Sequence, residues 1–191
     1  MLIIKKQKNT PGTRHSVQLS KFLLFKNNKL IKTLIKPHKK SNGRSPSTGH
    51  ITVWHKGGGC KNLYRKINFS NNETFSIVLG IMYDSYRNNI ISLNFDLINK
   101  KFFNSNTILN NYAGSLLTCQ EKINDFYLGY RSKIKNLPVG SLISNISKRS
   151  QHTSLVRSAG TFAQLIQKKD KLCKIRLPSN KTIVFPINSF A

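Results

Sequence analysis

Acidic residues are the scarcest class of side chain in this sequence. Its 191 residues include 32 Lys and Arg but only 6 Asp and Glu, so the formal net charge is +26 at pH 7. So large an excess of one sign would repel itself in a compact free monomer, and we therefore expect a polyanion to be the usual partner. Nucleic acid is favoured over a membrane surface, because no amphipathic basic helix is evident.

Long hydrophobic runs and paired cysteines are missing as well. No apolar run approaches the roughly 20 residues of a membrane-spanning helix. The three cysteines, Cys60, Cys119 and Cys173, are odd in number and far apart, which argues against a disulfide framework and favours a reducing compartment. His50, His55 and Cys60 match no common zinc spacing, so we expect neither a bound metal nor a cofactor.

The positive charge is divided into two blocks. Residues 1–72 contain 16 Lys and Arg and no acid, whereas residues 73–125 contain 4 basic and 5 acidic residues. Residues 126–191 contain 12 basic residues and one acid, Asp170. The nearly neutral middle is therefore expected to be a folded body, and the two basic blocks are expected to carry the binding surfaces.

Short apolar runs that are typical of strands recur from Ile51 onward. The candidate strands are residues 51–55, 63–69, 75–83, 90–95, 108–117, 141–146, 172–177 and 182–187. Their spacing of about 8–12 residues, with turn residues between them, predicts a small barrel or sandwich followed by a second small all-β unit. The first 50 residues show little hydrophobic periodicity, so they are predicted to form an extended basic arm that becomes ordered on a polyanion.

The segment 43–69 carries the most distinctive binding pattern. Three consecutive glycines, Gly57–Gly59, follow the strand-like residues 51–55, and Lys56 and Lys61 lie on either side of them. Consecutive glycines leave the backbone bare, so a bulky partner can approach closely and phosphates can accept hydrogen bonds from the N–H groups. A plain glycine-rich hairpin with solvated lysines is the alternative.

A series of short motifs extends over nearly the whole chain. They are Pro11–His15, Gly43-Arg44, His50–Lys61 with Tyr64, Arg65 and Phe69 behind it, Tyr83–Ile90, Leu137–Gly140 and Arg157–Thr161. In this order they resemble the large-subunit ribosomal protein two ("L two") family. The resemblance implies an all-β fold, with an OB-type barrel at 51–126 and an SH3-like barrel at 127–191 behind the basic arm at 1–50. It also implies binding to large-subunit rRNA beside other ribosomal proteins, with no catalysis.

The expected RNA contacts come from the arm, the glycine segment and both barrels. They are Lys5, Lys6, Arg14, His15, Lys39, Lys40, Arg44, Thr52, His55, Lys56, Gly57, Gly58, Gly59, Lys61, Tyr64, Arg65, Arg87, Arg149, Arg157, Ser158, Gly160 and Thr161. The arm cations would neutralise phosphates without reading sequence, and the recognition as a whole would rest on RNA shape and 2′-OH groups. Arg87 is expected either to pair with Asp84 or to point at the RNA.

The sequence departs from the family pattern at several positions. Trp54 replaces an arginine or other polar residue, and it is expected either to stack on a base or to lie in a core. Cys60 replaces a histidine. The resemblance implies a long Gly- and His-rich extension that this sequence lacks, so we expect either that a separate polypeptide supplies it or that this ribosome does without it. A split protein, an AT-biased composition and no evident transit peptide together favour synthesis in a mitochondrion and a place in the matrix ribosome.

Two other classes of protein are the alternatives. A free OB-fold protein that binds single-stranded nucleic acid would need several exposed aromatics on one face. Tyr64, Phe69, Tyr83 and Tyr86 are available, but the long arms argue against this class. An enzyme would need a nucleophile with a base and an orienting acid. Cys60 and His55 could be the nucleophile and the base, but no acid lies near them in the sequence. We therefore expect no enzyme.

Overall fold

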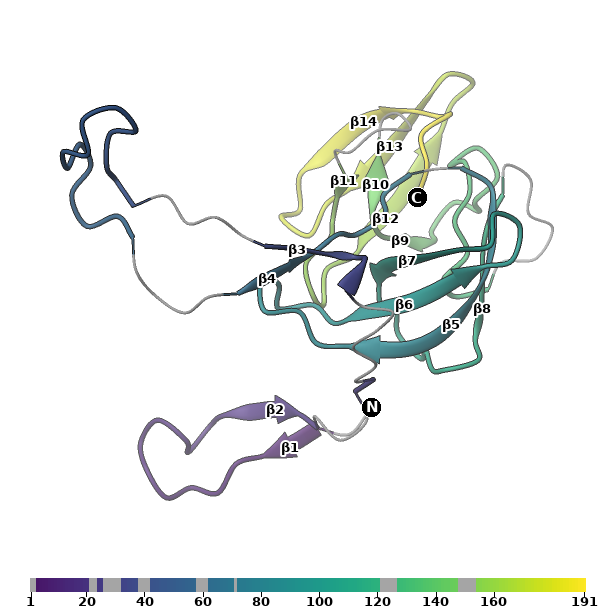
Figure 1. Cartoon of the computed structure of the whole chain (residues 1–191). Helices are drawn as coiled ribbons and strands as arrows, with labels where there is room; N and C mark the ends of the chain where they lie inside the picture. Colours follow the sequence, from purple (N-terminus) through teal and green to yellow (C-terminus); the bar gives the residue numbers. More distant parts are fainter. Residues whose placement is uncertain are drawn as a thin grey trace.

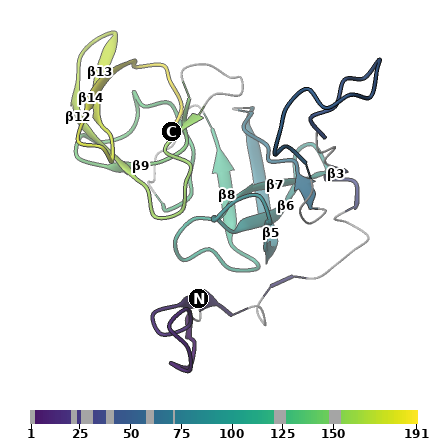
Figure 2. The same ribbon diagram turned by 90° about the vertical axis from the view of Figure 1, so that its left-hand side faces the viewer.

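The computed structural model describes residues 3–20, 24–25, 32–37, 42–57, 62–70, 72–120, 127–147 and 154–191. Its regular elements are the strands β1–β14. Two four-stranded antiparallel sheets lie one in each half of the chain, and each is the main sheet of a small barrel (Figures 1 and 2). The prediction of an all-β protein with two successive barrels is confirmed.

The first barrel is built on β5 (Thr74–Met82), β6 (Ile91–Asp96), β7 (Lys101–Asn106) and β8 (Leu116–Cys119). The strand order is β7-β6-β5-β8, and each neighbouring pair is antiparallel. Alternate residues of β5 are buried, as in a strand with one face on a core. At Gly80 the ladder with β6 shifts register, and a Cβ there would lie 2.7 Å from atoms of the Phe25 side chain. Glycine is therefore required at this bulge.

Part of the predicted arm belongs to this barrel. Phe25 and Leu34 pack against a core cluster of three buried side chains, Met82, Ile91 and Leu93. The extended, coreless arm predicted for residues 1–50 is therefore wrong at these two positions, because their apolar surface is removed from water by the sheet. The domain limits at residues 50 and 126 remain a prediction.

Two short strand pairs flank the first barrel. β3 (Ile35–Pro37) pairs with β4 (Leu63–Arg65), and β1 (Ile3–Lys5) pairs with β2 (Val17–Leu19) in a hairpin that projects from the molecule (Figure 1). After β4, the backbone N–H of Asn68 donates to the carbonyl oxygen of Asn104 in β7 at 2.8 Å. This bond fixes the chain leaving β4 against the first sheet.

The second barrel contains β9 (Leu142–Ile143), β10 (Ile146–Ser147), β11 (Ser154–Leu155), β12 (Ala163–Lys168), β13 (Leu172–Arg176) and β14 (Thr182–Pro186). The main sheet has the order β14-β13-β12-β9, and β10 pairs with β11. The core consists of Ile134, Ile143, Ile146, Ala163, Leu165, Cys173, Ile175 and Phe185. Lys174 and Arg176 are exposed on β13 between and beside these core residues, so this strand is half-buried and has a basic outer face.

Three differences separate the observed strands from the predicted ones. Residues 51–55 do not form a strand, and only Ile51 makes an isolated bridge, to Arg44. β1, β2, β3, β7, β11 and β12 were not predicted. Of the segment predicted at 108–117, only the last two residues belong to a strand, because Asn110 (φ 61°) and Gly114 (φ 94°) turn the chain before β8 begins. Within the described residues, no helix is both long and apolar enough to span a membrane.

Candidate nucleic-acid interface

The β1-β2 hairpin gathers four of the predicted RNA-contact residues. Lys5, Lys6, Arg14 and His15 are all exposed on it. The backbone N–H of Lys6 donates to the carbonyl oxygen of Ser16 at 3.2 Å, and this bond extends the pairing of the two strands beyond Lys5. The hairpin therefore presents cations on a defined backbone rather than on a featureless tail, which suits contact with phosphates.

Residues 42–57, which we call the glycine loop, fold back on the carbonyl oxygen of Gly43. That oxygen accepts hydrogen bonds from the N–H groups of Thr52 (2.8 Å) and Val53 (3.0 Å) and from Thr52 Oγ1 (3.1 Å). Gly43 has a φ of +64°, and a Cβ there would lie 2.4 Å from the Val53 carbonyl oxygen. Only glycine fits that position. The loop projects away from both barrels in Figure 1.

The glycine loop carries a shallow hollow with a basic rim. The hollow has a volume of about 440 Å³ and is lined by Asn42, Arg44, Ile51, Val53, Trp54, His55, Lys56 and Gly57. Arg44 Nη1 donates to the carbonyl oxygen of Gly49 at 3.1 Å, which holds the guanidinium against the loop. His55 and Lys56 are exposed beside it. Trp54 is 74% exposed, so the core position that was one of its two expected places is excluded.

Asp84 is the buried acid of a cluster that contains three predicted contact residues, Tyr64, Arg65 and Arg87. Its carboxylate is fully buried and lies 2.6 Å from Arg87 Nη1 and 3.7 Å from Arg65 Nη1. Arg87 Nη2 donates to the hydroxyl of Tyr64 at 3.1 Å, and the Tyr64 ring packs edge-on against Tyr86. Of the two expectations for Arg87, pairing with Asp84 is confirmed. These side chains join β4 to the loop that follows β5, and their contact with RNA stays a prediction.

The charge of Arg87 is secured by this cluster. Burial alone would lower the pKa of its guanidinium, but the hydrogen bonds to Asp84 and Tyr64 and the negative charge of Asp84 outweigh burial and raise the pKa. Tyr64 and Tyr86 pack on each other, so they do not form an open stacking face. This arrangement disfavours the alternative of a free single-strand-binding protein.

Arg157, Ser158, Gly160 and Thr161 form one tight turn of the second barrel. Thr161 donates to the carbonyl oxygen of Ser158 from its N–H at 3.2 Å and from Oγ1 at 2.7 Å, and Gly160 has a φ of +72°. The Arg157 guanidinium lies over the ring of Phe69 at 5.2 Å from its centroid. The turn is therefore next to the end of the segment 43–69, and these two predicted contact regions are neighbours.

Six predicted contact residues lie outside the described residues. They are Lys39, Lys40, Gly58, Gly59, Lys61 and Arg149. Cys60, the candidate nucleophile of the enzyme alternative, lies outside them too. Gly57, the first of the three glycines, has a φ of +128° and is exposed, as a backbone open to a partner requires.

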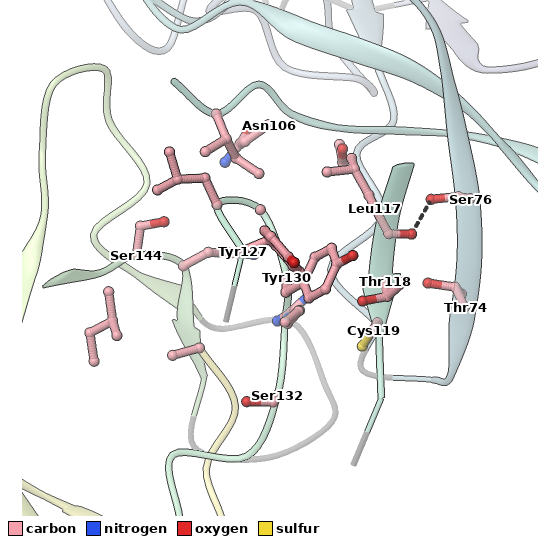
Figure 3. Close-up of a pocket in the computed structure, with 18 of the residues that line it drawn as sticks. Thr74, Ser76, Asn106, Leu117, Thr118, Cys119, Tyr127, Tyr130, Ser132 and Ser144 are labelled. Atoms are coloured by element: carbon pink, nitrogen blue, oxygen red, sulfur yellow. Dashed lines mark hydrogen bonds between the residues drawn. The ribbon is translucent and has the colours of Figure 1, made fainter. Parts of the chain in front are cut away.

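A cavity between the two barrels is a feature that no sequence pattern predicted. The cavity has a volume of about 360 Å³, and Figure 3 shows β5 and β8 with Ser76 and Cys119 on one side and Ser144 on the other. Several buried polar atoms of its lining residues have no hydrogen-bond partner: Asn94 Oδ1, Asn106 Oδ1, Arg131 Nε and Nη2, Ser141 Oγ and Asn145 Oδ1. Such atoms are suited to bind ordered water or another polar group.

Arg131 is the most unusual residue of this cavity. Burial lowers the pKa of its guanidinium, and attraction to Cys119 acts in the opposite direction. Its Nη1 donates to the carbonyl oxygen of Ser70 at 3.3 Å, which ties the chain entering the second barrel to the first one. Burial also raises the pKa of the Cys119 thiol. Within the described residues no group of three or more His, Cys, Asp or Glu could hold a metal ion.

These features indicate the class of structural RNA-binding proteins: two small barrels carry a cationic hairpin and a basic glycine loop. The family model described as "Ribosomal Proteins L2, RNA binding N-terminal domain" matches residues 31–109. The model described as "Ribosomal Proteins L2, C-terminal domain" matches residues 128–191. With the relatives described next, these matches show that the chain belongs to the ribosomal protein L2 family, and the predicted ribosomal, RNA-binding role is confirmed at the level of that family.

Two relatives illustrate the similarity. The chain is 37% identical over 198 residues to "Large ribosomal subunit protein uL2m" of Reclinomonas americana, with 100% of this chain and 69% of the relative covered. It is 30% identical over 190 residues to "Large ribosomal subunit protein uL2" of Rickettsia typhi, with 94% of this chain and 65% of the relative covered. The chain thus spans about two thirds of the length of these two relatives.

Proposed function

We propose that this chain is a structural, non-catalytic component of a mitochondrial large ribosomal subunit, and that its β1-β2 hairpin, glycine loop and Arg157–Thr161 turn bind rRNA. The absence of any carboxylate in residues 1–72 carries the proposal, because it leaves 16 basic residues of that block without an acid near them in sequence. A phosphate backbone is the partner that such a surface fits best.

The mitochondrial assignment is supported by the similarity to uL2m of Reclinomonas americana, which is a mitochondrial ribosomal protein. Other ribosomal proteins are the further partners that follow from membership of the family. A separate polypeptide that carries the Gly- and His-rich extension stays a prediction from the sequence.

Salt dependence tests the proposed mode of binding. The full chain is titrated with in vitro transcripts of large-subunit rRNA segments over a series of KCl concentrations. Each phosphate contact adds about 0.7–0.9 to the slope of log K against log salt concentration. The double variant Lys5→Gln/Lys6→Gln removes two such contacts. It should therefore bind more weakly, and the magnitude of its slope should fall by about 1.5.

The matched control removes the same charge from the nearly neutral block. Lys100 and Lys101 are adjacent and exposed. Lys100 lies in the turn before β7, and Lys101 is the first residue of β7. The double variant Lys100→Gln/Lys101→Gln should keep the slope of the unsubstituted chain. Equal slopes for all three proteins would contradict a phosphate-binding role of the hairpin.

A further inference from the structure

Trp54 is an unusually exposed side chain for its type. It is 74% exposed, and Ile51 and Val53 beside it are each 48% exposed. Together they give the glycine loop an apolar patch in a block of the chain that is otherwise strongly basic. Exposed apolar surface of this kind marks an interaction site, and the question is which partner it fits.

The indole is held on a preorganised support. The Gly43 carbonyl oxygen accepts the N–H groups of Thr52 and Val53, which fixes the two residues that precede Trp54. His55, which follows it, has a left-handed φ of 55°. The segment is thus already ordered before a partner binds, so it loses little conformational entropy on binding.

The charged residues around Trp54 indicate the chemical class of its partner. Arg44, His55 and Lys56 line the same hollow as Trp54, and the first acid of the chain is Glu73. A partner must therefore combine a flat apolar face with a negative charge a few ångströms away. A nucleotide combines the two, because its base has a π-face and its phosphate is an anion.

We propose that Trp54 stacks on an unpaired, splayed-out nucleotide of the bound rRNA, with Arg44 and Lys56 contacting the adjacent phosphates. The inference rests on the proposed rRNA-binding function and names one recognition element within it. The base must be unpaired, because the faces of a base inside a duplex are covered by its stacked neighbours.

The single tryptophan makes this contact directly observable. Trp54 is the only tryptophan in the chain, so all indole emission of the full chain comes from the glycine loop. In titrations with the rRNA transcripts, stacking should quench the emission in parallel with binding measured by filter retention. It should also protect the indole from quenching by acrylamide. An RNA duplex without unpaired bases should leave the emission of the protein nearly unchanged at salt concentrations where the transcripts bind.

Three variants separate stacking from charge and from folding. Trp54→Ala should weaken transcript binding about 10-fold, in line with the loss of one base–aromatic stack, and should leave the salt slope unchanged. Trp54→Tyr should retain most of the affinity because it keeps an aromatic face. Tyr112→Ala is the matched control, because Tyr112 is a 68% exposed aromatic side chain in the nearly neutral block, and it should bind as the unsubstituted chain does.

These experiments distinguish a failure of the stacking proposal from a failure of the proposed rRNA-binding function. Transcript binding with quenched emission and a 10-fold loss in Trp54→Ala would support the stacking contact. Transcript binding with unchanged emission and an unchanged affinity of Trp54→Ala would overturn it and leave the rRNA-binding function standing. A failure of the unsubstituted chain to bind any transcript would overturn both.

Discussion

Replacing Phe185 with alanine should destabilise the second barrel by about 3–5 kcal/mol, the usual cost of deleting a buried aromatic ring. Phe185 is 1% exposed on β14 and packs in the cluster that includes Leu165, Cys173 and Ile175. The ring is large relative to this small barrel, so neighbouring side chains can fill the space only in part. Urea unfolding followed by circular dichroism measures the effect as a lower transition midpoint.

Phe162→Ala is the control for this substitution. Phe162 is 57% exposed at the entrance to β12, so removal of its ring should change the free energy of unfolding by less than about 0.5 kcal/mol. Similar losses for Phe162→Ala and Phe185→Ala would contradict the assignment of the core. Hydrogen exchange of peptides from β12–β14 should rise in Phe185→Ala, and exchange of β5 and β6 should remain unchanged if the two barrels unfold independently.

Asp84→Asn should destabilise the first barrel by about 2–4 kcal/mol, because it removes the charge that neutralises two guanidinium groups. Asparagine keeps the shape of the side chain, but it cannot form the ion pairs with Arg87 and Arg65. The arginines are partly exposed, with side-chain exposures of 25% and 19%, so the loss should fall below that of a fully buried pair. Hydrogen exchange of the β5 and β6 peptides measures it.

Asp96→Asn, at the end of β6 in the same barrel, is the matched control. Asp96 is also buried, and its described hydrogen bonds come from the Ile98 N–H (3.0 Å) and the Asn99 amide (2.7 Å). Both donors are neutral, so the substitution should cost about 1 kcal/mol. A loss for Asp96→Asn as large as that for Asp84→Asn would show that the ion pairs add nothing to the stability.

Strands rich in apolar residues could be predicted from the sequence. β5, β6, β13 and β14 each fall within about one residue of the expected range, because each is a short run of strand length in which β-branched and other apolar residues are frequent. β7 was missed because Asn and Ser supply three of its six residues, and these residues favour turns. In the fold, Asn104 is buried and donates to the carbonyl oxygen of Lys66 at 3.0 Å, a partner that local sequence cannot reveal.

The incorrect strand at residues 51–55 has a different cause. Its β-branched and aromatic residues have strand propensity, but two of its N–H groups donate to one carbonyl oxygen, that of Gly43, so no strand ladder continues. The same bonds leave Trp54 exposed. The charge distribution was thus sufficient to predict a basic amino-terminal block with binding residues, but it predicted an extended arm in place of the hairpin. The arrangement of the hollow depends on hydrogen bonds between residues nine or ten positions apart.

The interior features of the site were the least predictable. The local sequence offered only one of these contacts, the pairing of Arg87 with Asp84 three residues before it. The fold adds Arg65 to this cluster and holds the half-buried Arg131 against Ser70, a residue 61 positions earlier in the chain. The contacts of Arg65 and Arg131 join residues far apart in the sequence, which contains no local signal for them.

Sedimentation of the native protein tests the central claim, that this chain is a component of the large ribosomal subunit. A mitochondrial lysate of the source organism is fractionated on a sucrose gradient, with and without ribonuclease, and the chain is located by mass spectrometry. The account predicts co-migration with large-subunit rRNA at moderate salt and release to the top of the gradient after ribonuclease treatment. Sedimentation near the top in both samples would contradict it.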